Sequence, residues 1–182
     1  YREALELSKK IRKNYTNTTM VKNNYAYLHF LLGNFKEAWR LYAQAIEIAE
    51  TFQINNYLVH VYNGQADILR DISEYEEAEK IYLEALKLAE SISYPLGQAQ
   101  IFSGLMQLNF LSENFNEALF YIRETARVNK EGLDLPVHQE NFGKVYLAMG
   151  QYDLAKSCFE KVIIGLGEDP QPDQILVETY FH

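Results

Sequence analysis

The sequence is poor in the residues that break helices or cross-link a chain. Cysteine occurs once, at Cys158, so the chain cannot form an internal disulfide and its composition suits a reducing, cytoplasmic setting. Four prolines and nine glycines in 182 residues leave room for long uninterrupted helices. No stretch approaches 18 consecutive apolar residues and no secretory signal is visible, so we predict no membrane span.

Positive charge is also scarce. The chain has 17 basic and 25 acidic residues, a formal net charge of −8, and no run of five or six basic residues. A surface of this kind binds nucleic-acid phosphates and anionic membranes poorly, because it repels both. Proteins and extended peptides, basic ones in particular, are the partners that this composition favours.

Groupings of catalytic or metal-binding residues are missing from the sequence. None of the four histidines pairs with another at a metal-ligand spacing. Gly165-Leu-Gly167 is too short for a phosphate-binding loop, and it follows a predicted helix instead of opening one. We therefore predict no catalytic residue, no metal and no cofactor, with an unrecognised active site as a remote alternative.

The dominant feature is a repeated pair, an aromatic residue followed three positions later by alanine. Successive aromatics are 34, 40, 40 and 37 residues apart, a period typical of stacked helical hairpins. The pairs are Tyr1/Ala4, Phe35/Ala38, Tyr75/Ala78, Phe115/Ala118 and Tyr152/Ala155.

Each pair opens an amphipathic helix in which apolar residues recur at helical spacing. A short turn precedes the aromatic, as at Gly33-Asn34 and Gly150-Gln151, where glycine lets the chain reverse. A second helix lies before each turn. These earlier helices are predicted over residues 18–32, 56–72, 95–112 and 136–149.

This arrangement divides the chain into a single array of hairpins. Residues 1–15 are predicted as the second helix of a preceding unit, and residues 174–182 as the start of a further helix after the loop at 167–173. We expect the chain to be part of a longer protein. The four units between these ends are predicted at residues 18–51, 56–92, 95–131 and 136–167.

The units resemble the tetratricopeptide repeat (TPR). The best copy runs from Asn141 to Phe159 and carries the family's glycine, tyrosine, Gly-x-Tyr-x-x-Ala and phenylalanine positions in order. The 40-residue intervals are similar to the longer repeats of kinesin light chains, Pins-type adaptors and the sensor domains of bacterial regulators. We therefore predict an all-α, right-handed α-solenoid of antiparallel hairpins, similar to a TPR superhelix.

The resemblance places the first helix of each unit on a concave face that binds protein or peptide. Positions 12, 8 and 5 before each repeated aromatic share one side of that helix. Polar side chains are also the default on any solvated helix face, so these are candidates only. The candidate ligand-binding residues are Asn23, Tyr27, Phe30, Asn63, Asp67, Arg70, Ser103, Gln107, Phe110, Glu140 and Lys144.

Two functions remain open from the sequence. The first is a non-catalytic binding scaffold, the sensor or adaptor module of a bacterial signalling or regulatory protein. The alternative is self-association as a homodimer, because helices at the ends of a solenoid expose apolar faces that a second copy can cover.

Overall fold

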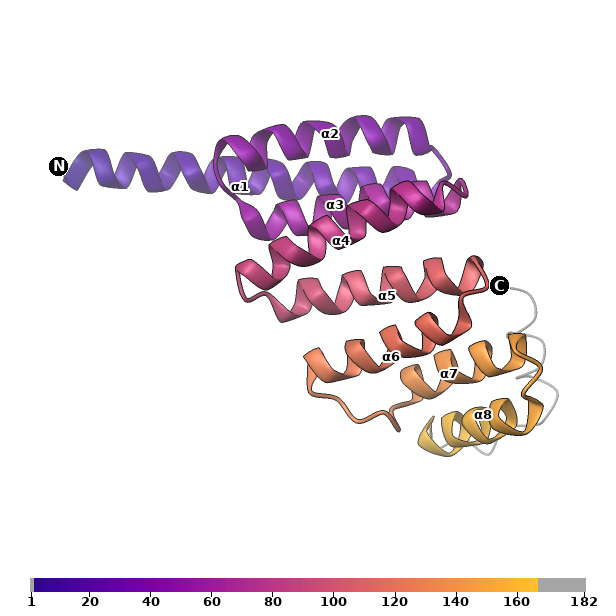
Figure 1. The fold of residues 1–182 in the computed structure, drawn as a ribbon. Helices are drawn as coiled ribbons and strands as arrows, with labels where there is room; N and C mark the ends of the chain where they lie inside the picture. The colour runs from indigo at the N-terminus through magenta and orange to yellow at the C-terminus, as the bar shows by residue number, and fades with distance from the viewer. Residues whose placement is uncertain (1, 167–182) are drawn as a thin grey trace.

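The fold is built from helical hairpins stacked one on the next (Figure 1). The computed structural model describes residues 2–166, with side chains from residue 10 onward. This part of the chain contains eight helices and is all-α, as predicted. The helices are α1 (Arg2–Leu31), α2 (Phe35–Thr51), α3 (Asn55–Asp71), α4 (Tyr75–Ser91), α5 (Pro95–Leu111), α6 (Phe115–Asn129), α7 (Pro136–Ala148) and α8 (Tyr152–Leu166).

Consecutive helices pair as antiparallel hairpins, and each hairpin packs on its neighbours in chain order. Helix α3 contacts both α1 and α5. The first helices of the first three hairpins therefore form a row along one side of the stack. Helix α7 packs on α6 and α8. The loop before it, residues 130–135, is longer than the other connections, so the fourth hairpin joins the stack differently from the others.

Helix ends are set by one repeated backbone motif. At the α1–α2 turn the Asn34 amide donates to the His29 carbonyl at 2.8 Å, and the intervening Gly33 has a φ of +72°. This hydrogen bond closes a turn of six residues and satisfies one of the last carbonyl groups of the helix. It forms when the residue that follows the helix has a left-handed backbone. Ser73 and Glu113 adopt the same left-handed backbone without being glycine. The predicted turns at Gly33, Ser73, Glu113 and Gly150 are therefore confirmed.

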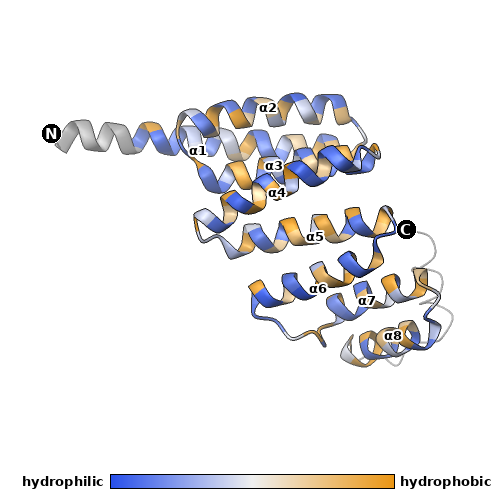
Figure 2. Ribbon diagram, in the orientation of Figure 1, coloured by the Kyte–Doolittle hydropathy of each residue, from blue (hydrophilic) through white to orange (hydrophobic). Residues whose placement is uncertain are grey.

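Apolar residues fill the seams between hairpins. The largest buried cluster joins α3, α4 and α5 and includes Ala78, Tyr82, Ile101 and Leu105, all fully buried. Helix α5 has no charged residue between Pro95 and Leu111 and is rich in hydrophobic positions (Figure 2), because it is packed between α4 and α6. Cys158 is buried, where its thiol packs as a small apolar group.

The first helix differs from the sequence expectation. Residues 1–15 and 18–32 were predicted as separate helices, but α1 continues from Arg2 to Leu31. The hydroxyl groups of Thr16, Thr18 and Thr19 each donate to the carbonyl four residues earlier at 2.9 Å, which keeps these polar groups within the helix. The Tyr15 ring also stacks on Phe52 at 3.7 Å and holds this stretch against the first hairpin.

The expected loop at 167–173 and the further helix from residue 174 lie outside the described residues.

Two glycines allow close contact between hairpins. A Cβ atom at Gly64 would overlap the Tyr42 ring, and one at Gly104 would overlap the Tyr82 ring. Each tyrosine belongs to the second helix of one hairpin, and each glycine to the first helix of the next. Both rings are buried and packed on both sides, so neither is free to swing away.

Gly64→Ala is therefore expected to destabilise the chain although alanine is the better helix former. Overpacking a core typically costs about 1–3 kcal/mol, which exceeds the roughly 1 kcal/mol gained from helix propensity. Urea unfolding followed by circular dichroism measures the change. Gly132→Ala, where the added methyl group meets no atom within 4 Å, is the control. Equal stability of Gly64→Ala and the parent would contradict this packing.

Candidate binding groove

A groove of about 570 Å³ opens along α1, α3 and α5. Eight of the eleven predicted residues line it, two or three from each of the three helices. They are Asn23, Tyr27, Phe30, Asn63, Asp67, Arg70, Ser103 and Gln107. The structure therefore brings these eight side chains to one surface.

The other three predicted residues lie elsewhere. Phe110 packs edge-on against Phe115, with ring centroids 6.0 Å apart, and contributes to the core of the third and fourth hairpins. Glu140 and Lys144 pair with each other at 2.7 Å on α7. Helix α7 is outside the row formed by α1, α3 and α5, so a stripe extrapolated through all four hairpins is longer than the groove.

The sequence stripe also left out part of the lining, which includes Asn24, Tyr42, His60, Gly64, Gln100 and Gly104. A repeat signal for these residues does exist. His60 and Gln100 lie one turn before the predicted stripe, 40 residues apart, and Gly64 and Gly104 show the same interval. Tyr42 belongs to a second helix, so an analysis limited to first helices cannot find it.

A buried polar network forms the centre of the groove. The Tyr82 hydroxyl donates to Asp67 Oδ1 at 2.6 Å, and Arg70 Nη1 donates to the same oxygen at 2.7 Å. Arg70 also binds Asp71 through Nε and Nη2 at 2.9 and 2.8 Å. The guanidinium is thus held between two carboxylates, and burial together with Asp67 raises the pKa of Tyr82 far above its ordinary value.

Asn63 extends this network and has an unused acceptor. Its Nδ2 donates to Asp67 Oδ2 at 3.0 Å, which fixes the orientation of the amide. Among buried side-chain oxygens and nitrogens of the described residues, Asn63 Oδ1 and Gln139 Oε1 accept no hydrogen bond. A buried acceptor without a donor costs about 1–3 kcal/mol, so Asn63 Oδ1 suits a ligand N–H group.

Both ends of the groove differ in character. At one end the Tyr27 and Phe30 rings stack with centroids 6.1 Å apart and form an apolar wall. At the other end Gln100 and Gln107 are exposed. The Ser103 hydroxyl donates to its own helix, at Ala99 O. The lining therefore combines an aromatic wall, several amides and a charge network in which one guanidinium lies between two carboxylates.

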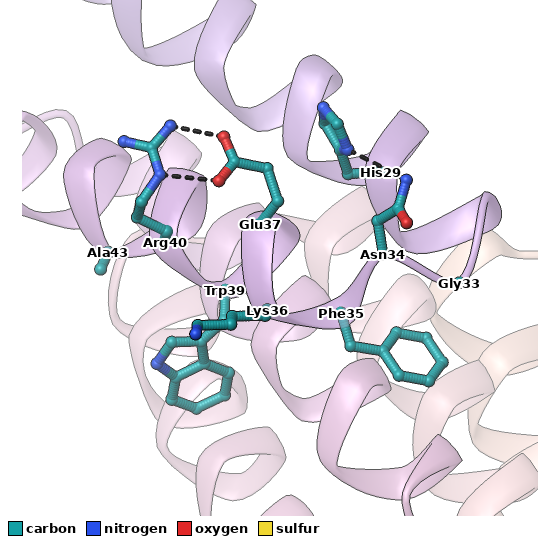
Figure 3. A pocket seen from close by; sticks show the side chains of 9 residues that line it. All are labelled: His29, Gly33, Asn34, Phe35, Lys36, Glu37, Trp39, Arg40 and Ala43. Atoms are coloured by element: carbon teal, nitrogen blue, oxygen red, sulfur yellow. Dashed lines mark hydrogen bonds and ion pairs between the residues drawn. The ribbon is translucent and has the colours of Figure 1, made fainter.

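A second hollow, of about 840 Å³, lies at the α1–α2 turn (Figure 3). Its polar groups contact one another: Arg40 Nε donates to Glu37 Oε2 at 2.8 Å, and the Asn34 amide lies 3.5 Å from His29 Nδ1. The Trp39 ring points away from both contacts (Figure 3). This hollow is larger, but none of its lining residues has a buried polar side-chain atom without a partner, so the groove is the better candidate.

Within residues 2–166 no three His, Cys, Asp or Glu side chains come together in a way that holds a metal ion. In the same residues, no helix has both the length and the apolar character needed to cross a membrane.

Stacked helical hairpins with a groove along their first helices define an α-solenoid repeat protein. The tetratricopeptide-repeat profile matches residues 21–52, 59–92 and 140–163. The chain is therefore a tetratricopeptide-repeat protein, as the sequence motifs predicted. Such repeats generally form protein-binding scaffolds and are usually non-catalytic.

A solved structure of another protein shares this fold. BtubC (BKLC) from P. vanneervenii superposes with a TM-score of 0.68 at 21% identity, over 94% of this chain and 76% of that one. PilF of Pseudomonas aeruginosa gives a TM-score of 0.48 at 17% identity, over 84% of this chain and 78% of that one. None of the curated proteins compared with the chain matches it.

His60 makes the groove sensitive to pH. Its Nε2 lies 2.9 Å from the Tyr94 hydroxyl, and burial lowers the pKa of the imidazole, partly offset by Gln100. Unfolding exposes the ring, so the unfolded chain takes up a proton more readily. This stabilising contribution is complete above the ordinary pKa of about 6.5 and is lost as the pH falls towards the lower folded value.

His60→Gln is expected to remove this pH dependence. The free energy of unfolding of the parent, relative to the variant, should fall as the pH is lowered from about 8 to about 5. Denaturant unfolding at a series of pH values measures the difference, and an NMR titration of the His60 ring reports its pKa directly. A difference independent of pH, or a ring titrating above 6.5, would contradict this assignment.

Proposed function

We propose that the chain is a non-catalytic scaffold that binds an extended peptide segment of a partner protein in the groove along α1, α3 and α5. The observation that carries the proposal is the orphan acceptor Asn63 Oδ1 in the groove lining. A main-chain N–H group is the commonest donor that a peptide presents, and each non-proline residue supplies one. Pairing with it satisfies Asn63 without requiring a particular side chain.

The rest of the lining supports an extended peptide over a compact ligand. Gln100 and Gln107 each offer a donor and an acceptor, which suits the alternating groups of a peptide backbone. Tyr27 and Phe30 provide an apolar wall for one ligand side chain. Arg70, the one basic side chain among the residues that line the groove, is already held by Asp67 and Asp71, so neither phosphate nor a strongly acidic segment is favoured.

The biological setting is a further part of the proposal. We infer that the chain is the sensor or adaptor module of a bacterial signalling or regulatory protein in the cytoplasm. The long repeat supports this setting, and one buried cysteine is compatible with a reducing compartment. Peptide capture would then either recruit a partner or be transmitted along the packed hairpins to another part of the protein.

The test is selection from a library of random linear peptides on the immobilised chain. Peptides enriched on the parent are then measured against Asn63→Ala/Gln107→Ala, for which we expect at least tenfold weaker binding, or about 1.4 kcal/mol. Thermal unfolding confirms that the variant is folded.

Asn116→Ala/Gln151→Ala is the matched control, because it removes two amides from exposed positions outside the groove. It should bind the peptides as the parent does. Peptides that bind all three proteins equally would place the binding site elsewhere. A library that yields no binding peptide would argue against peptide recognition.

A further inference from the structure

The charged centre of the groove holds more negative than positive charge. Asp67 and Asp71 both bind the guanidinium of Arg70, at 2.7 and 2.8 Å. Two carboxylates therefore share one cation, which leaves the network with an excess of negative charge. Arg70 is the only lysine or arginine on α3 and α5, and Lys22 of α1 donates to Gln44 of α2 at 2.7 Å. Among the residues that line the groove, no second lysine or arginine offsets the excess.

The position of this network on α3 strengthens its negative character. The three charges lie at the end of α3, whose last residue is Asp71. The C-terminus of a helix carries a partial negative charge, equivalent to about half an elementary charge, which favours cations nearby. Helices α1 and α5 run parallel to α3, so their C-terminal ends lie on the same side of the stack (Figure 1). The helix ends therefore add to the excess from the carboxylates.

Burial limits how far water can compensate this charge. The side chains of Asp67 and Arg70 are 16% and 9% exposed, whereas that of Asp71 is 34% exposed. Burial raises the pKa of Asp67, although Arg70 and the Tyr82 hydroxyl act in the opposite direction. The neighbours of Asp67 therefore do not fully replace its lost hydration. Asp71 is the carboxylate of this network that a ligand can reach most easily.

The hydrogen-bonding groups that remain open here are acceptors. Both hydrogen bonds from Arg70 to Asp71 go to Oδ1, which leaves Oδ2 open to a ligand donor. Asn63 Oδ1 has no donor, and the Ser103 hydroxyl proton is already directed to its own helix. Ammonium and guanidinium groups carry several N–H donors, no acceptor and a positive charge. They match both the charge and the open acceptors.

We propose that the peptide bound in the groove carries a lysine or arginine side chain that binds the carboxylate of Asp71 beside Arg70. This inference rests on the proposed peptide binding and adds the chemistry of the partner segment. The main chain pairs with Asn63, and one basic side chain reaches the end of α3. With it the network holds two carboxylates and two cations. The net charge of −8 attracts any basic segment, but Asp71 selects which position of the peptide is basic.

The test uses the peptides selected on the parent chain. Each lysine or arginine is replaced in turn by an uncharged analogue of similar length, norleucine or citrulline. We expect one position at which the replacement weakens binding about fivefold, between the values of exposed and buried ion pairs. The same replacement should have little effect on binding to Asp71→Asn, which removes the charge and keeps an oxygen for Arg70. Asp71→Glu restores the charge and should restore the effect.

Asp153→Asn is the matched control, because it removes an exposed carboxylate on α8, outside the groove. It should respond to each replacement as the parent does. Circular dichroism confirms that all variants are folded.

Three outcomes would overturn the inference. Peptides that lose binding to Asn63→Ala/Gln107→Ala but need no basic side chain, or an equal loss on the parent and Asp71→Asn, would exclude the Asp71 contact and leave groove binding standing. Binding that is lost only on acetylation of the peptide's amino terminus would assign the cation to that group instead. A library without any binding peptide would overturn the proposed function together with this inference.

Discussion

The stacking of the first three hairpins depends on a tyrosine from one hairpin fitting against a glycine of the next. Tyr42 meets Gly64 and Tyr82 meets Gly104, and there is no room for even one additional methyl group at either glycine. In each contact the tyrosine precedes the glycine by 22 residues, and the second contact lies 40 residues after the first. The two contacts therefore set the spacing between successive first helices. Because interiors are close-packed, the ring position also fixes where α3 and α5 stand relative to one another.

The same contact determines the chemistry of the groove. A fully buried tyrosine needs a partner for its hydroxyl group, and Tyr82 finds it in Asp67 on the preceding α3. A carboxylate in that position needs compensation in turn, which Arg70 and the Asn63 amide provide. The orphan Asn63 oxygen is thus a buried member of this network that is left without a partner, and a ligand donor that reaches it would complete the network.

Much of the fold and of the groove lining could be predicted from the sequence, because the chain repeats one pattern four times. The turns, the hairpins and eight groove residues follow from the aromatic/alanine pairs and helical periodicity. Three features did not follow. Helix α1 is continuous because Tyr15 stacks on Phe52, a contact across 37 residues that local propensity does not encode. Glu140 and Lys144 miss the groove because the longer loop before α7 breaks the regular stacking, and Phe110 misses it because its ring packs on Phe115 in the core. Tyr42 enters the groove from α2, the second helix of its hairpin, whereas only first helices were expected to line it.

The central claim is that the row of α1, α3 and α5 is a peptide-binding groove whose orphan acceptor is Asn63. The most direct measurement is a crystal structure of the chain with a library-selected peptide. The account predicts an extended peptide across these three helices, with a main-chain N–H group within hydrogen-bonding distance of Asn63 Oδ1. A peptide seated in the hollow at the α1–α2 turn, or on the outer helices, with Asn63 unchanged, would contradict it.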